Sequence, residues 1–214
     1  MRYCLILSIL LLLACSHSPE RSIKPEKKIY SLDENSVGND EITCWGIGEI
    51  DLDNDMSTLE EKADKKNMSV DSIVKDGVFE GFVTTLWKGT SKEIIVHWKE
   101  KTPPFHTIDF LEIRQEKSPY HFVNGIKLGT TLREMVKLNG RSPISLYGFG
   151  SAQAGTFASF GSGKLSGDIP CFGGVFDLPE NRDSRQFKDG EKLLSSDPVL
   201  TRHETRLVSI QIHN

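Results

Sequence analysis

Three carboxylates at alternate positions, Asp51, Asp53 and Asp55, are the residues whose spacing best suits metal binding. Oxygen ligands on alternate residues converge on one hard cation in calcium-binding loops. An EF-hand loop also needs glycine at its sixth position and a bidentate glutamate at its twelfth, and here Met56 and Lys62 hold those places. The pattern therefore predicts a strand with its acids in solvent that leads into a helix, and calcium binding is the alternative.

Motifs for nucleophilic catalysis and phosphate binding are incomplete in this chain. Ser151 and Ser162 lie among glycines but lack the Gly-x-Ser-x-Gly spacing of a nucleophile elbow. The run 161–165 lacks the upstream glycine and the hydroxyl residue of a phosphate-binding loop. The histidines occur in separate segments, without the paired spacing of a zinc site. We therefore expect no catalytic residue, no cofactor and no enzymatic activity.

The segment 146–174 is rich in glycine and aromatic residues. Glycine allows the backbone to approach a ligand closely, and exposed aromatic rings are strong binding anchors. The same composition is also typical of bulges and tight hairpins whose rings fill the core. Both interpretations stay open at this point. The rings that would form a binding surface are Tyr147, Phe149, Phe160 and Phe172.

The N-terminus carries the pattern of an exported protein. One positive residue, Arg2, is followed by the apolar run 5–13, which is shorter than the roughly 20 residues that cross a bilayer but is typical of a signal peptide. The tetrad 12–15, Leu-Leu-Ala-Cys, resembles the lipobox of bacterial lipoproteins. The resemblance implies cleavage before Cys15, acylation of its thiol and attachment to a lipid bilayer in the bacterial cell envelope. Ser16 at the next position favours the outer membrane.

The charge distribution argues against nucleic-acid binding, and the cysteine count allows one disulfide in the mature chain. The chain has 26 Lys+Arg against 30 Asp+Glu, interspersed without a basic stripe, which disfavours nucleic-acid binding. Cys4 leaves with the signal peptide and Cys15 carries lipid, so Cys44 and Cys171 remain. Disulfides persist in exported proteins, and one here would close a loop of about 130 residues. The alternative is two buried free thiols.

Patterning divides the mature chain into a polar tether and two folded units. Residues 16–40 are charged, contain prolines and have few apolar side chains, as in a disordered tether. In the first unit we expect a helix from Ser57 or Thr58, capped by a hydroxyl and ending near residue 67, and then several strands. These strands are a hairpin formed by 78–87 and 93–100 and a further strand at 108–114. The predicted ranges are 1–14 for the signal peptide, 15–40 for the acylated cysteine and tether, 41–117 for unit one and 118–214 for unit two.

The second unit repeats the plan of the first. The run Thr130-Thr131-Leu132-Arg133-Glu134 copies the run 57–61 about 73 residues later, and it again offers a capping box. The final strands also match, 111–114 against 210–213, but at an offset of about 99 residues, which places an insertion near 167–198. The fold class that follows is α+β, with two tandem units that each combine a helix and an antiparallel sheet.

A second resemblance concerns the stretch 125–140, from Gly-Ile-Lys-Leu-Gly through Leu-Asn-Gly. It resembles segments of uncharacterised bacterial envelope lipoproteins. More loosely, it is similar to the helix-opening segment of the SmpA/OmlA and β-lactamase-inhibitor-protein group. Those proteins build helix-then-sheet units and bind other proteins. The resemblance implies a non-enzymatic interaction module whose partner is another envelope protein. The alternatives are a small-ligand or calcium-binding lipoprotein and an envelope hydrolase.

Overall fold

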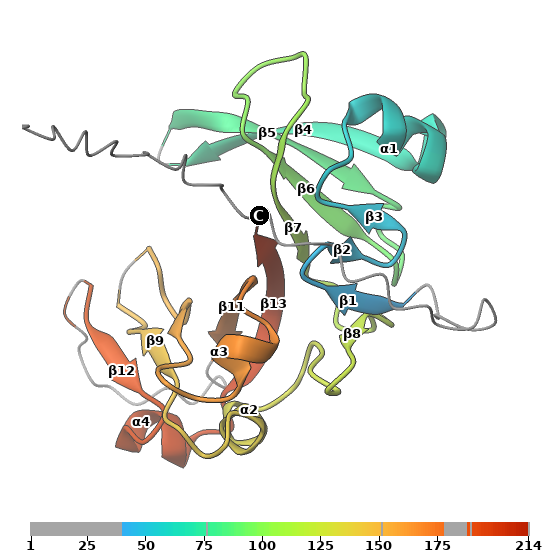
Figure 1. Cartoon of the computed structure of the whole chain (residues 1–214). Coiled ribbons are helices and arrows are strands. Elements are labelled where there is room, and N and C mark those ends of the chain that lie inside the picture. Colours follow the sequence, from blue (N-terminus) through green and yellow to red (C-terminus); the bar gives the residue numbers. More distant parts are fainter. Residues whose placement is uncertain (1–39, 76, 151, 178–187, 189, 214) are drawn as a thin grey trace, which may run out of the picture. The chain divides into compact units, whose positions relative to one another are not determined.

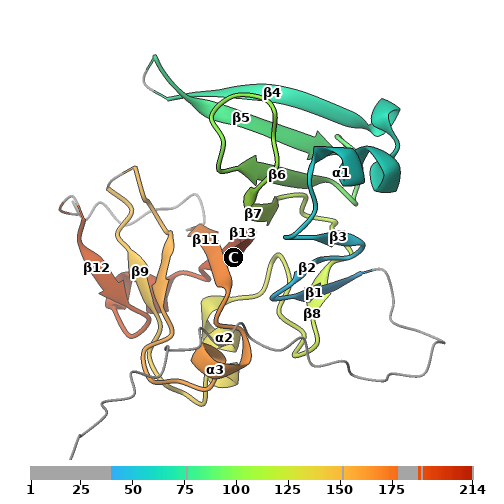
Figure 2. The same cartoon turned by 45° about the horizontal axis from the view of Figure 1, so that its top comes forward.

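The computed structural model describes residues 40–75, 77–150, 152–177, 188 and 190–213. All of them belong to a compact unit that spans Val37–Asn214. The predicted signal peptide 1–14, the acylated Cys15 and the tether up to residue 39 lie outside the described residues. The order of the elements along the chain and in space can be followed in Figures 1 and 2.

The largest sheet has six strands in the order β11-β13-β7-β6-β5-β4 (Figure 1), and every neighbouring pair is antiparallel. One face of this sheet packs into the core: in β6, for example, Ile94, Val96 and Trp98 are buried and alternate with half-buried residues. This period of two places alternate side chains on opposite faces. The strands are β4 (Met68–Lys75), β5 (Val78–Leu86), β6 (Ile94–Trp98), β7 (Ile108–Ile113), β11 (Phe172–Asp177) and β13 (Arg206–His213).

Two smaller sheets complete the strand arrangement. The first has the order β3-β2-β1-β8, in which β1 and β8 are parallel and the other pairs are antiparallel. The second has the order β10-β9-β12, and a bridge between Thr156 and Val175 links it to β11. The strands are β1 (Glu41–Thr43), β2 (Gly46–Ile47), β3 (Ile50–Asp51), β8 (His121–Phe122), β9 (Ser145–Tyr147), β10 (Phe157–Ser159) and β12 (Lys192–Leu194).

The helices are short, and the two longer ones supply buried residues to the core. Leu59 and Ala63 do so from one helix, and Leu132 and Met135 from another. Helices this short are marginal in isolation, so packing of their apolar residues stabilises them. The helices are α1 (Met56–Ala63), the 3-10 turn η1 (Lys65–Asn67), α2 (Leu132–Leu138), α3 (Leu165–Asp168) and α4 (Pro198–Arg202).

The architecture is therefore mixed α+β and rich in antiparallel sheet, as predicted. The hairpin predicted at 78–87 and 93–100 is the pair β5·β6. The capping box predicted for the second helix is present, since Thr131 and Glu134 bond reciprocally at the start of α2. The cap predicted for the first helix is wrong, because Asp55, rather than Ser57 or Thr58, accepts the hydrogen bond from the helix N-terminus.

Candidate interaction surface

Strand β4 is one of the two outer strands of the six-stranded sheet among the described residues, at the end opposite β11. It pairs with β5 on one side only, from Met68 opposite Leu86 to Lys75 opposite Val78. A long edge strand presents a row of free N–H and C=O groups, to which another extended chain can add. The edge is interrupted by one irregularity, between Ile73 and Val74, where the register with β5 shifts.

Apolar side chains are exposed along this edge and at the tip of its hairpin. Val70 is 50% exposed, Val74 59%, Val78 65% and Phe79 42%. Val70 and Val74 lie four residues apart in β4 and therefore on the same face of the strand, and Val74 is opposite Phe79. Single exposed apolar residues are ordinary, but contiguous ones mark binding sites. We call these four residues the edge surface.

A row of aromatic rings connects the edge surface to the core. The ring of Phe79 lies 5.2 Å from that of Phe82, which lies 5.9 Å from that of Phe105, and Phe105 stacks 5.4 Å from Trp98. The indole N–H of Trp98 donates a hydrogen bond of 2.9 Å to the buried hydroxyl of Thr84. The rings thus give the exposed edge a packed support, so little order has to be gained when a partner binds.

A hollow of about 560 Å³ adjoins the edge surface. Val70 belongs to both, and the hollow lies between the start of α1, the start of β4 and the segment 103–106. Pockets of this size bury small ligands or single side chains of a partner. Its apolar lining consists of Met56, Met68, Val70, Pro103, Pro104 and Phe105, and its polar lining of Asp55, Ser57, Glu60, Lys65 and His106.

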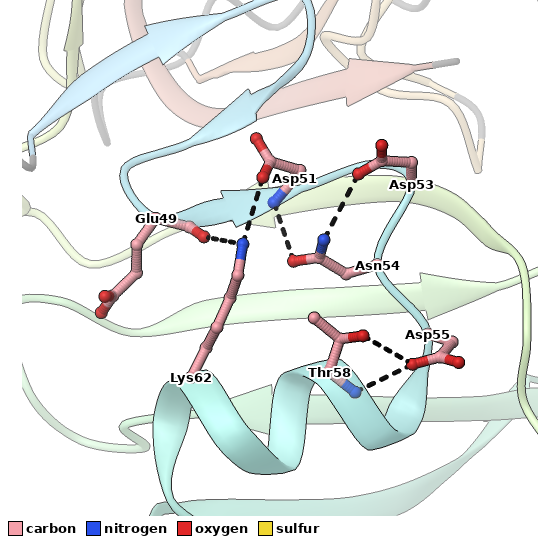
Figure 3. Close-up of polar contacts among 7 residues, drawn as sticks. All are labelled: Glu49, Asp51, Asp53, Asn54, Asp55, Thr58 and Lys62. Carbon is pink, nitrogen blue, oxygen red and sulfur yellow. Dashed lines mark hydrogen bonds and ion pairs between the residues drawn. The ribbon is translucent and has the colours of Figure 1, made fainter.

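The predicted acidic loop leads to this hollow, and its carboxylates have separate partners (Figure 3). Asp51 is bonded to Lys62 at 3.1 Å, Asp53 accepts from the side chain of Asn54 at 3.3 Å, and Asp55 accepts from the N–H of Thr58 at 2.8 Å. The hydrogen bonds from Thr58 and Ser57 lower the pKa of Asp55 to about 2. The part of the chain that the structure describes contains no group of three or more His, Cys, Asp or Glu side chains that could hold a metal ion.

The predicted aromatic binding surface is largely internal. Phe160 and Phe172 are each 5% exposed and pack together with centroids 5.4 Å apart, so these two rings fill the core and do not form a surface. Tyr147 and Phe149 are half-buried, and the ammonium group of Lys192 lies 5.1 Å from the centre of the Tyr147 ring. Of the two interpretations of the glycine- and aromatic-rich segment, the structural one explains Phe160 and Phe172.

A buried carboxylate lies on the face of the large sheet opposite the core face. Glu112 is 1% exposed and accepts hydrogen bonds from Ser209 at 2.5 Å, Gln211 at 3.1 Å and Arg114 at 2.8 Å, and His97 Nε2 lies 3.0 Å from it. Burial alone would raise the pKa of Glu112, but the bonds from His97, Arg114 and Ser209 lower it to about 2. In this arrangement the serine hydroxyl bonds to the carboxylate and not to the imidazole, which a serine nucleophile would need as its base.

Cys44 and Cys171 form a disulfide, with Cα atoms 5.4 Å apart and a sequence separation of 127. The bond joins the turn between β1 and β2 to the residue just before β11. Of the two alternatives for these cysteines, the structure contains the disulfide. It connects the start of the described unit to its largest sheet.

Strand β4, which carries Val70 and Val74 of the edge surface, was not among the predicted elements. The available signal was the set of β-branched residues Val70, Ile73 and Val74, but two polar residues separate Val70 from the adjacent pair, and a solvent-exposed edge strand lacks a clear alternation of buried and exposed positions. None of the described helices has the length and apolarity needed to cross a membrane. Comparison of this chain with protein-family models, with curated proteins and with solved structures finds no match.

Proposed function

We propose that this chain is a lipid-anchored protein of the bacterial cell envelope, most simply of the outer membrane, and that it acts as a non-enzymatic interaction module. Its partner would be another envelope protein that docks on the edge surface. The observation that carries this proposal is the pair of exposed apolar residues Val70 and Val74 on the outer strand β4, with exposed Val78 and Phe79 on its partner strand β5. Exposed apolar side chains beside an unpaired strand edge promote aggregation of a monomer. Contiguous ones therefore usually mark a surface that binds a partner.

The edge surface fits an extended apolar segment of the partner. Such a segment would add to β4 through main-chain hydrogen bonds, and every second side chain would contact Val70 and Val74. One of these side chains would enter the hollow beside Val70, where Met68 and Phe105 would enclose it. The main-chain bonds would supply affinity, and the hollow would select the partner's side chain.

The test is recovery of the partner from detergent-solubilised envelopes with a matched pair of variants. We expect the full chain to recover one protein in stoichiometric amount, and Val70→Glu/Val74→Glu to lose it. The control, Leu194→Glu/Val208→Glu, adds the same two charges at exposed apolar positions of β12 and β13 (53% and 43% exposed). Equal recovery by both variants would place the interface elsewhere, and no recovery by the unaltered chain would remove the proposal.

The lipid anchor is proposed from residues 1–15 and needs its own test. Labelled palmitate should be incorporated by the unaltered chain and not by Cys15→Ser, and mass spectrometry should find the mature N-terminus at an acylated Cys15. A bare residue 15 in the natural product would remove the anchor. It would leave the edge surface as an interaction site of an unanchored protein.

The finer fold prediction, two duplicated units, is also part of this proposal. In favour of it, the last strands of the predicted units, β7 and β13, lie side by side. Outward from this pair, β6, β5 and β4 lie on one side, and β11, β10 and β9 follow on the other through the bridge between Thr156 and Val175. Apart from β12, which pairs with β9 at the outer edge, the order is symmetrical about β7·β13, as expected when two copies of one unit meet along their final strands. In this alignment β11 (Phe172–Asp177) is one of the matched strands, so the insertion would start after it and not near residue 167.

A second candidate is a small apolar ligand held in the hollow by Met56, Met68 and Phe105, as the volume of about 560 Å³ permits. Saturable binding of an anilinonaphthalene sulfonate dye to the native chain, lost in Met68→Arg and kept in Leu194→Arg, would favour it. Loss of the protein partner in Val70→Glu/Val74→Glu, with no dye binding, would favour the interaction module.

A further inference from the structure

Three hollows surround helix α2, and cationic side chains line each of them. Lys127, Lys137 and Arg206 line one of about 500 Å³, and Arg133 lines both of the others, of about 250 and 210 Å³. Because α2 is common to all three, these residues belong to one continuous surface of the unit. We call it the basic face, and it consists of the exposed side chains Lys127, Arg133, Lys137, Arg141, Arg202 and Arg206.

Acidic residues are fewer than cationic residues in the lining of these hollows. Two of them, Glu134 and Glu204, line the same hollows. Glu134 closes the capping box by accepting from the backbone N–H of Thr131 at 2.8 Å, and Glu204 pairs with Arg206 at 2.6 Å. Six cationic groups against two acids give the described lining a formal charge of +4, whereas the whole chain carries −4. The positive charge is therefore concentrated on one face of an acidic protein.

The basic face begins beside the point where the N-terminal segment enters the fold. Strand β1 pairs in parallel with β8, and the N–H of His121 donates to the carbonyl of Asp40, the first described residue, at 3.0 Å. The turn after β8 exposes Val123 (88%), and the next residues, Gly125 and Lys127, line the largest of the three hollows. In Figures 1 and 2 the chain passes from β8 to α2 through one loop, with no other helix or strand between them.

We propose that the basic face binds the anionic headgroups of phospholipids and turns this side of the folded unit toward the bilayer. The orientation, but not the binding, rests on the proposed lipid anchor, since the anchored segment would arrive at Asp40 and β1, next to Val123 and Lys127. Each Lys or Arg close to an anionic membrane surface adds electrostatic attraction, and salt screens it. Val123, exposed at the edge of the same face, would enter the interface between headgroups and acyl chains.

The membrane contact gives the edge surface a defined position. Strand β4 lies at the edge of the six-stranded sheet and lines none of the three hollows. It therefore stays available to a protein partner when the six cations around α2 bind headgroups. Without headgroup binding, a folded unit tethered only through its N-terminal segment would sample all orientations relative to the membrane. Headgroup binding would therefore reduce the orientational entropy that the partner has to overcome.

The test is flotation of the full chain with vesicles, in a Cys15→Ser background so that acylation does not contribute. We compare vesicles of phosphatidylcholine alone with vesicles that also contain phosphatidylglycerol. The test variant is Arg133→Glu/Lys137→Glu. The matched control is Lys92→Glu/Lys99→Glu, which changes the net charge equally at exposed positions near β6. All chains share the same N-terminal residues, so any apolar binding by that segment is common to them.

We expect the unaltered chain and the control to favour anionic vesicles, and the test variant to lose this preference by on the order of tenfold or more. Raising the salt concentration should weaken the preference of the unaltered chain. Equal binding to neutral and anionic vesicles, or equal loss in both double variants, would overturn the proposal. So would tighter binding of the unaltered chain to a nucleic-acid oligomer than to anionic vesicles. Retained cooperative unfolding of the test variant shows that any loss is not misfolding, and the salt series tests the proposal even if that variant fails to fold.

Discussion

Ser209 of β13 donates a short hydrogen bond to Glu112 of β7, 97 residues earlier in the chain, on the side of the sheet that faces away from the core. Gln211 donates to the same carboxylate from two residues further along β13. The two strands that end the predicted units are thus joined by side chains as well as by their backbone ladder. Buried carboxylates with several donors contribute strongly to stability when all donors are in place.

The first prediction concerns the pH dependence of stability. The pKa of Glu112 is about 2 in the folded chain and 4.5 for the ordinary side chain, so the unfolded state binds more protons between these values. The resulting stabilisation, on the order of 3 kcal/mol, is complete above about pH 4.5 and is lost as the pH falls toward 2. Glu112→Gln should lower the free energy of unfolding at pH 7 and flatten its decrease in acid, as measured by urea denaturation. Glu116→Gln, at an exposed position, is the control, and an unchanged acid profile in Glu112→Gln would contradict the prediction.

The second prediction concerns the disulfide. Replacing both Cys44 and Cys171 by alanine releases a constraint across 127 residues and should cost about 2–5 kcal/mol of unfolding free energy. Chemical denaturation of the oxidised chain, the reduced chain and the double variant measures this cost. The reduced chain should behave like the double variant. A double variant as stable as the oxidised chain would show that the bond does not constrain the unfolded state.

The third prediction separates the two interpretations of the acidic loop. Asp55 caps α1, whereas the nearby Asp53 is exposed and accepts a hydrogen bond from the side chain of Asn54 at 3.3 Å. Asp55→Ala should lower the thermal midpoint by about 2–4 °C, and Asp53→Ala should change it little. Calcium should leave all three midpoints unchanged. A calcium-dependent rise that disappears in Asp53→Ala would instead favour the calcium site.

The fourth prediction concerns the glycine-rich run 161–165. Asn139, at the end of α2, donates to the carbonyl of Phe160 at 2.9 Å and accepts from the N–H of Leu165 at 3.0 Å. A Cβ atom at Gly163 would overlap the carboxamide of Asn139. Gly163→Ala should therefore destabilise the fold by about 1–3 kcal/mol. Gly167→Ala, where a Cβ meets no atom within 4 Å, is the matched control and should be neutral or slightly stabilising in denaturation experiments.

Local chemistry explains why some elements were predictable. The capping box of Thr131 and Glu134 and the stop at Asn139-Gly140 depend on residues within one turn of the helix, and Gly140 takes the left-handed conformation (φ 69°) that such an end requires. The hairpin β5·β6 was predictable because its β-branched and aromatic strands flank a short polar segment. In each case the decisive contacts lie close together in the sequence.

The functional surfaces depend on contacts between distant residues, and the sequence could not assign them. Charges that are interspersed along the chain gather on the basic face because β13 bridges to the start of α2, with Arg206 opposite Thr131. Phe79, Phe160 and Phe172 are all phenylalanines, but Phe160 and Phe172 are buried in the core, whereas Phe79 is exposed near the end of a hairpin. Composition identifies apolar residues without deciding which of them are buried.

The bond between Cys44 and Cys171 has a mechanical consequence. A pull on the N-terminal end of the described unit meets the three residues of β1 first, whose few hydrogen bonds would open one after another. At Cys44 the load passes through a covalent link to the start of β11, and Cys171 is itself held by the N–H of His213. Tension applied at the N-terminal end would then reach β11 and its ladder with β13, instead of unravelling the chain from its first residue.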